Sequence, residues 1–236
     1  MSTLNRSDVV YGSTGMRFES VFVRPDVPEP LPGLIVLHGL FGLQEMDIRF
    51  VERLAEHGYA VLLHGWQTTD RDPADDNVGR GVGMAVRWLA GQPGVADEPF
   101  GLIGVCRGGS LAVISAAALQ CFSRVVSFYG QAHYAGKSTL AKPVSPITLV
   151  DRISAPLLAI HGERDTTFPA SDSRDFCERL LAKGGSCELI THPDAEHGFF
   201  LEGHRNYHPD AAEAIWPRLL SFLERNRRKA DEQGPP

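Results

Sequence analysis

The sequence predicts an α/β fold with a mostly parallel central sheet and helices on both of its faces. Short apolar runs alternate along the chain with longer segments whose apolar residues recur at helical spacing. Such alternation is typical of parallel strands, because a crossover helix has to join each strand to the next. Several of the short runs are apolar throughout, as expected for strands that helices cover on both sides.

The elements follow in order from these patterns. The expected strands are the short apolar runs at 21–23, 34–37, 59–63, 101–105, 124–129, 156–160 and 186–190. The expected helices are the periodic segments at 45–57, 75–89, 110–119, 171–183 and 210–226. Gly58 closes the first helix, as a glycine after a helix C-terminus does. Pro217 falls inside the last helix, where a proline costs about 3 kcal/mol, so we expect a kink or a new helix start there.

Composition indicates one soluble domain, and it excludes several classes of protein. Hydrophobic residues make up 43% and charged residues 22% of the 236 residues, which is enough apolar surface to exclude intrinsic disorder. No repeat, linker or break in composition divides the chain, so we expect a single domain over 1–236 with a frayed tail at 229–236. The net charge of −6 and the lack of a basic block argue against nucleic-acid binding.

The chain ends and the cysteines bear on location. No apolar run reaches the roughly 18 residues of a membrane span, and the first residues lack the apolar stretch of a signal peptide. We therefore expect a cytoplasmic protein in a reducing compartment, without membrane contact. Cys121, Cys177 and Cys187 are expected to be structural thiols that fill helices or strands, because four cysteines are too few for a disulfide scaffold.

The most informative segment is Gly104-Val105-Cys106-Arg107-Gly108, between an expected strand and a helix of small residues. It has the form of a nucleophile elbow with cysteine in place of serine. Glycine is needed on both sides of the nucleophile, because a side chain there would collide with the neighbouring strand or helix. The helix N-terminus that follows favours the thiolate form of Cys106. The guanidinium of Arg107 either lowers the pKa of the Cys106 thiol further or points to solvent.

An acid and a base follow in the order that this motif requires. Asp165 ends the loop after the strand at 156–160, and His197 lies in the loop after the strand at 186–190. All three candidates therefore come just after the carboxyl end of a parallel strand, where such sheets place their sites. Asp165 as a plain helix cap, His197 as a loop histidine and Cys106 as a buried thiol are the structural alternatives.

These residues and several further motifs resemble the dienelactone hydrolase family of α/β-hydrolases, from about 21 to 223. The motifs are Leu37-His38-Gly39-Leu40-Phe41-Gly42-Leu43, Leu54-Ala55-Glu56-His57-Gly58-Tyr59-Ala60, the elbow, Val126-Ser127-Phe128-Tyr129-Gly130, Ile160-His161-Gly162-Glu163-Arg164-Asp165 and His197-Gly198-Phe199. The resemblance implies a Cys106, Asp165 and His197 triad. It also implies an oxyanion hole formed by the backbone N–H groups of Leu40 and Arg107.

The chain departs from the family at substrate-binding positions. The family's founding enzymes carry a glutamate just before the loop amide of the oxyanion hole, where this chain has Gly39. A family arginine that binds the substrate carboxylate corresponds to Leu201. The segment 65–104 is short for the helical insert that holds a second arginine and a tyrosine. The departures predict an ester or lactone less anionic than dienelactone.

Other residues near the expected site allow weaker inferences. Phe41, Trp66, Phe168 and Phe199 fall in loops where they would line an apolar substrate pocket, with core packing as the alternative. His38 either orders the oxyanion loop or is a structural histidine. The histidines at 192, 197, 204 and 208 fit no common zinc spacing, so we expect no metal and no organic cofactor.

The sequence thus predicts a hydrolase of small carboxylic esters or lactones that works through a thioester on Cys106. Its expected partner is the small-molecule substrate, and the chain is expected to be a monomer or small homo-oligomer. One alternative is a small-molecule-binding or thiol-sensing protein on a hydrolase scaffold. Another is a serine hydrolase that uses Ser110 or Ser115, although neither serine lies at the apex of the elbow.

Overall fold

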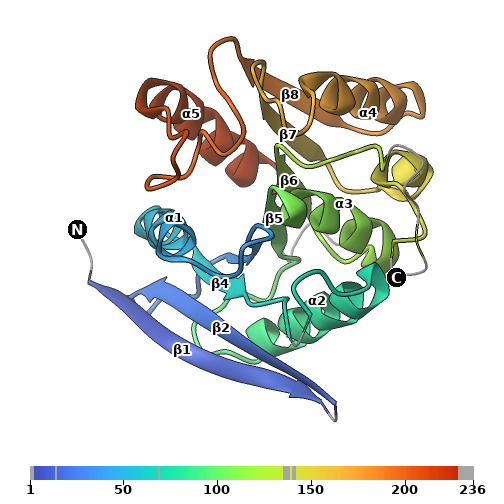
Figure 1. The fold of residues 1–236 in the computed structure, drawn as a ribbon. Helices are drawn as coiled ribbons and strands as arrows, with labels where there is room; N and C mark the ends of the chain where they lie inside the picture. The colour runs from blue at the N-terminus through green and yellow to red at the C-terminus, as the bar shows by residue number, and fades with distance from the viewer. Residues whose placement is uncertain (1–2, 14, 69, 135–138, 140–141, 228–236) are drawn as a thin grey trace.

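The computed structural model describes residues 3–13, 15–68, 70–134, 139 and 142–227. Its centre is an eight-stranded sheet in the order β1-β2-β4-β3-β5-β6-β7-β8 (Figure 1). The strands are β1 (Leu4–Ser13), β2 (Met16–Pro25), β3 (Gly33–Leu37), β4 (Ala60–His64), β5 (Gly101–Val105), β6 (Arg124–Phe128), β7 (Leu157–Gly162) and β8 (Cys187–His192). The six strands from β4 to β8 pair in parallel, and β1 and β2 add an antiparallel hairpin.

Helices cover both faces of the sheet, which confirms the predicted fold class. The helices are α1 (Glu45–Glu56), α2 (Asp75–Ala90), α3 (Arg107–Leu119), the 3₁₀ segment η1 (Pro146–Arg152), α4 (Ala170–Ala182) and α5 (Pro209–Arg225). Apolar side chains of α1 and α5 pack on one face, and those of α2, α3, η1 and α4 pack on the other (Figure 1). The inner strands β3 to β7 are buried along their whole length, because both faces are covered.

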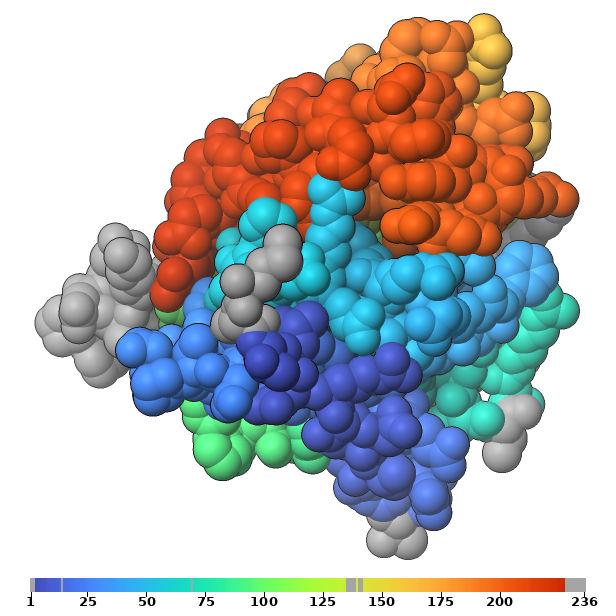
Figure 2. All heavy atoms as spheres, turned by 90° about the vertical axis from the view of Figure 1, so that its left-hand side faces the viewer, coloured from blue at the N-terminus to red at the C-terminus, as the bar shows by residue number. Residues whose placement is uncertain are grey.

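Segments from the two halves of the chain meet on the face of α1 and α5. Viewed from that side, the red and orange C-terminal part lies against the blue and cyan N-terminal part (Figure 2). Arg53 on α1 makes two hydrogen bonds to Glu213 on α5, at 2.6 and 2.7 Å. Between the two helices the ring of Phe50 packs edge-on against Trp216. These contacts close the apolar core on this side of the sheet.

Several elements differ from the sequence prediction. The hairpin strand β1 was not expected, and β2 extends well beyond 21–23. The helix α3 begins directly after Cys106 rather than at Ser110. Pro217 does not restart a helix, because α5 runs from Pro209 to Arg225 with Pro217 on its exposed side. The expected frayed tail at 229–236 lies outside the described residues.

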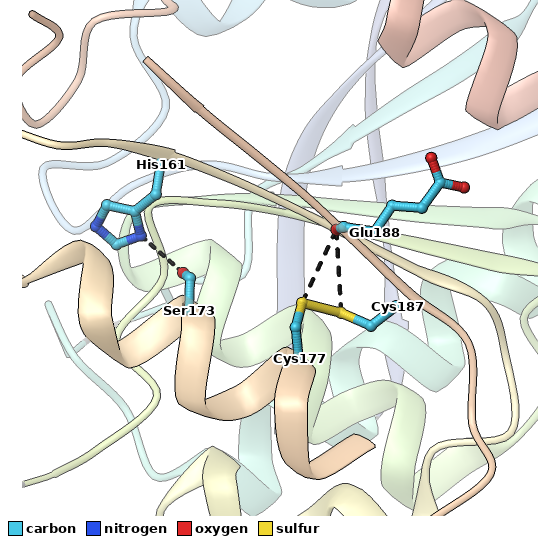
Figure 3. Close-up of a disulfide and its surroundings, with 5 residues drawn as sticks. All are labelled: His161, Ser173, Cys177, Cys187 and Glu188. Atoms are coloured by element: carbon cyan, nitrogen blue, oxygen red, sulfur yellow. Dashed lines mark hydrogen bonds between the residues drawn. A yellow bond between two sulfur atoms is a disulfide. The ribbon is translucent and has the colours of Figure 1, made fainter. Parts of the chain in front are cut away.

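Two cysteines form a disulfide that the sequence did not predict. Cys177 on α4 is bonded to Cys187 at the start of β8, and both sulfurs lie near the backbone carbonyl of Glu188 (Figure 3). The expectation that both residues are structural thiols was therefore wrong. Their sequence separation of 10 residues gave no signal, because only the packing of α4 on the sheet brings them together. Cys106 and Cys121 are free.

Candidate active site

Cys106 occupies a tight turn between β5 and α3. Its φ of 55° lies in the left-handed region, which is rare for residues other than glycine and stores strain. A Cβ on Gly104 would lie 2.0 Å from the carbonyl oxygen of Gly108, and one on Gly108 would lie 2.2 Å from that of Leu37. Both positions thus require glycine, as the sequence predicts. The turn places Cys106 immediately before the N-terminus of α3.

His197 and Asp165 form a hydrogen-bonded pair beside this turn. Nδ1 of His197 lies 2.7 Å from Oδ2 of Asp165. The other carboxylate oxygen, Oδ1, accepts hydrogen bonds from the backbone N–H groups of Thr167 and Phe168, both at 2.8 Å. Because an ionised carboxylate can only accept, Nδ1 of His197 is the donor. The pair therefore leaves Nε2 of His197 as the nitrogen that can accept a proton.

The thiol and the imidazole share one cleft. Cys106 and His197 both line a cavity of about 870 Å³. Nε2 of His197 is buried and has no hydrogen-bond partner among the described residues. Burial lowers the pKa of His197, but the bond to Asp165 and the neighbouring Cys106 thiol outweigh burial and raise this pKa from 6.5 to about 9. The pKa of the imidazole is thus raised by Asp165 and Cys106, the two residues that the sequence analysis groups with His197.

The carboxylate of Asp165 has a further neighbour that the sequence analysis missed. Nε2 of His161 lies 3.2 Å from Oδ2 of Asp165 and 3.0 Å from the carbonyl oxygen of Phe168. Nδ1 of His161 pairs with the hydroxyl of Ser173 on α4, at 2.7 Å (Figure 3). Burial raises the pKa of Asp165, but hydrogen bonds from His161 and His197 and the amide of Phe168 hold it well below its usual value. The i, i+4 spacing of His161 and Asp165 was the available signal.

The expected oxyanion-hole residues lie at the same cleft. Leu40, in the loop after β3, and Arg107, the first residue of α3, both line it. Within the described parts of the chain, neither backbone N–H donates to another group. His38 fixes the start of this loop: it is buried, its Nδ1 lies 2.8 Å from the carbonyl oxygen of Gly39, and its ring stacks on Trp66. Both amides are therefore free to bind an oxyanion.

The side chain of Arg107 is buried. The alternative that it points to solvent was therefore wrong. The residue is 8% exposed. Nε donates to Asp72 at 3.0 Å, Nη1 donates to the hydroxyl of Tyr134 at 2.7 Å, and Nη2 pairs with Asp75. Lys142 also pairs with Asp72. The two carboxylates balance the guanidinium charge, so Arg107 ties the start of α2 and the segment before it to the elbow.

Only two of the expected pocket aromatics line the cleft. Phe41, which is 73% exposed, and Phe168 do so. The expectation was wrong for Trp66 and Phe199, which are buried in the apolar core on opposite faces of the sheet. Trp66 donates from Nε1 to the carbonyl oxygen of His38, at 2.9 Å. In the described residues, no group of three or more His, Cys, Asp or Glu side chains is arranged to hold a metal ion.

The family model described as "Dienelactone hydrolase family" matches residues 64–226 of this chain. The chain belongs to the dienelactone hydrolase family. Membership makes it a hydrolase of lactones or esters. The described residues also contain no helix with the length and apolarity of a membrane span.

Known proteins of this family resemble the chain over most of its length. A "Putative carboxymethylenebutenolidase" of Yersinia pestis is 26% identical, with 89% of this chain and 85% of that protein covered. A "Probable 2-oxo-3-(5-oxofuran-2-ylidene)propanoate lactonase" of Bradyrhizobium sp is 28% identical, covering 90% and 91%. The crystal structure of a "Putative Dienelactone Hydrolase" from Klebsiella pneumoniae superposes with a TM-score of 0.86. The superposition covers 94% of this chain and 99% of that chain. Because the two sequences are only 23% identical, the likeness supports the fold alone.

Proposed function

We propose that this family member hydrolyses small carboxylic esters or lactones through a covalent thioester on Cys106. The observation that carries the proposal is the orientation of His197. Its Nδ1 is tied to Asp165, its Nε2 is buried without a partner among the described residues, and His197 lines the same cleft as Cys106. In this arrangement His197 is the general base, and Asp165 sets its tautomer and stabilises its cation.

The proposed reaction has two halves. First, Nε2 of His197 takes the thiol proton, and Sγ of Cys106 attacks the carbonyl carbon of the substrate. The N–H groups of Leu40 and Arg107 stabilise the oxyanion, where each such donor is worth about 3 kcal/mol. The carbon–oxygen bond to the leaving group then breaks, and that group takes the proton from His197. Second, His197 removes a proton from water, the hydroxide attacks the thioester, and the acid leaves as Sγ recovers its proton.

The residues at the family's substrate-binding positions favour a substrate less anionic than dienelactone. Arg107 is already paired with Asp72 and Asp75, and Leu201 is buried in the apolar core. Gly39 brings no carboxylate toward Cys106. The relative from Bradyrhizobium is named a lactonase, which supports lactones as well as open esters as candidates. The cleft volume of about 870 Å³ allows a leaving group of considerable size.

Replacement of the thiol tests this proposal directly. In Cys106→Ala, we expect hydrolysis of p-nitrophenyl esters to fall by about 10³-fold or more, because the residues of a triad act as a unit. Cys121→Ala is the matched control, since Cys121 is the other free cysteine and lies outside the cleft. Iodoacetamide should inactivate the wild type as one equivalent reacts at Cys106. Wild-type turnover by Cys106→Ala would refute the proposal, as would thiol oxidation by peroxide without turnover of any ester or lactone on a broad panel.

A further inference from the structure

A second, smaller cavity lies next to Cys106. Its volume is about 70 Å³, and its lining includes Gly39, Asp47, Cys106, Tyr129 and Leu201. This space, here called the recess, adjoins the large cleft: both are lined by Leu40, Cys106 and His197, whereas Tyr129 and Asp47 line the recess alone. At about 30 Å³ per water molecule in the liquid, the recess holds about two waters or a chain of a few heavy atoms.

Tyr129, in the wall of the recess, carries a buried hydroxyl that the rest of the chain leaves unused. The residue is 1% exposed, and its hydroxyl oxygen is buried without a hydrogen-bond partner among the described residues. A buried hydroxyl without a partner costs free energy, so native structures rarely keep one. The backbone of Tyr129 is also strained, with a φ of 38°, and its N–H is held by the carbonyl oxygen of Ile160 at 2.7 Å. Strain and an orphaned hydroxyl together are typical of a functional position.

The surrounding residues leave the hydroxyl of Tyr129 without an internal acceptor. Oδ2 of Asp47 is engaged by the backbone N–H of Gln44, at 2.9 Å, and the structure shows no bond from Asp47 to Tyr129. Gly39 contributes no side chain, although a Cβ there would make only ordinary contacts, with Cβ of Cys106 at 3.6 Å and with the carbonyl oxygen of Val105 at 3.9 Å. The ring of Tyr129 packs edge-on against His197, with ring centroids 4.8 Å apart. The ring of Tyr129 is therefore fixed beside His197, and Cys106 lines the same recess.

We propose that the recess binds the acyl part of the substrate and that the hydroxyl of Tyr129 donates a hydrogen bond to an oxygen on that acyl chain. This inference rests on the proposed function and specifies its substrate class: esters of short acids that carry an ether, hydroxyl or keto oxygen near the carbonyl carbon. The bound oxygen supplies the acceptor that the folded chain does not.

The order of the two chemical steps decides which part of the substrate enters the recess. The leaving group has to depart while the acyl group is still bonded to Sγ of Cys106, and water then has to reach the thioester. A cavity of about 870 Å³ gives the leaving group room to depart, whereas one of about 70 Å³ retains a small group. The acyl group therefore occupies the recess, and the large cleft takes the leaving group.

A matched pair of esters tests the role of Tyr129. p-Nitrophenyl methoxyacetate and p-nitrophenyl butyrate differ by one ether oxygen in place of a methylene. We expect Tyr129→Phe to lower the ratio of their kcat/KM values by about 3- to 10-fold, the loss of one hydrogen bond. The control is Tyr134→Phe, because the hydroxyl of Tyr134 lines the large cleft and is bound by Arg107. That variant should keep the wild-type ratio. An unchanged ratio in Tyr129→Phe would overturn the inference.

A labelling experiment separates this inference from the proposed function, because it requires no turnover. 2-Hydroxyethyl and propyl methanethiosulfonate attach chains that are nearly equal in size to Cys106, with and without an oxygen. In the Cys121→Ala background, the wild-type preference for the hydroxyethyl reagent should fall several-fold in Tyr129→Phe. If the protein shows this preference and its loss in Tyr129→Phe but hydrolyses no ester or lactone, the hydrolase proposal alone is refuted. Equal labelling ratios in the two proteins would refute the recess as an oxygen-binding subsite.

Discussion

At the scale of single residues, the carboxylate of Asp165 organises the candidate site. Its Oδ1 receives two backbone N–H groups, and its Oδ2 faces ring nitrogens of His197 and His161. These donors stabilise the ionised carboxylate inside the protein, where an uncompensated charge would be costly. The carboxylate in turn stabilises the protonated form of His197. The ionisation of His197 is therefore coupled to folding.

The pKa of His197 predicts how stability depends on pH. Because folding raises this pKa from 6.5 to about 9, protonated His197 stabilises the fold fully below about pH 6.5, and the contribution is lost as pH rises to about 9. We expect the free energy of unfolding of the wild type to exceed that of His197→Gln by about 3 kcal/mol more at pH 6 than at pH 9.5, as measured by urea titration. In the Asp165→Asn background this pH dependence should be smaller, because Asp165 is one of the two residues that raise the pKa of His197. A stability difference between the wild type and His197→Gln that grows with pH would contradict the raised pKa of His197.

At the scale of elements, the disulfide joins the two segments that follow the Asp165 loop. The helix α4 begins a few residues after Asp165, and β8 leads into the loop that carries His197. Cys177, in the middle of α4, is bonded to Cys187, the first residue of β8, and Ser173 on α4 contacts His161 (Figure 3). The bond also closes a short loop of the chain, which restricts the unfolded state.

Reduction of this bond should lower stability. For a loop of this length, the chain-entropy relation gives about 2–3 kcal/mol. We expect dithiothreitol to lower the free energy of unfolding of the wild type by that amount, measured by urea titration. The double variant Cys177→Ala/Cys187→Ala should not respond to the reductant. Cys121→Ala should respond as the wild type does, because its disulfide is intact. A wild type indifferent to reductant would show that the bond is absent or contributes nothing.

At the scale of the whole molecule, the order of strands assembles the site. Cys106 follows β5, Asp165 follows β7 and His197 follows β8, and these strands run parallel within one half of the sheet. Their carboxyl ends therefore meet at one edge, although the residues are far apart in sequence. Each face of the same sheet carries its own apolar core, with Trp66 on one face and Trp216 on the other. We propose that both cores belong to one cooperative domain over 1–236.

Unfolding of the two faces should therefore coincide. Trp216→Phe leaves fluorescence from Trp66 and Trp88, which pack on one face, whereas Trp66→Phe/Trp88→Phe leaves only Trp216 on the other. For each variant, the urea transition seen by fluorescence should superimpose on its transition by far-ultraviolet circular dichroism, as two-state unfolding requires. Separate midpoints for fluorescence and dichroism in either variant would show that the faces unfold independently.

Local sequence patterns determined the alternation of strands and helices, the elbow at Cys106, and the positions of Asp165 and His197 after their strands. These features depend on neighbouring residues, because periodicity and glycine placement act over one turn or one strand. The tertiary structure alone decided which distant groups meet. It buried Arg107 between Asp72 and Asp75, bonded Cys177 to Cys187, and left the hydroxyl of Tyr129 without a partner. Such contacts follow from sheet register and helix packing, which no local pattern specifies.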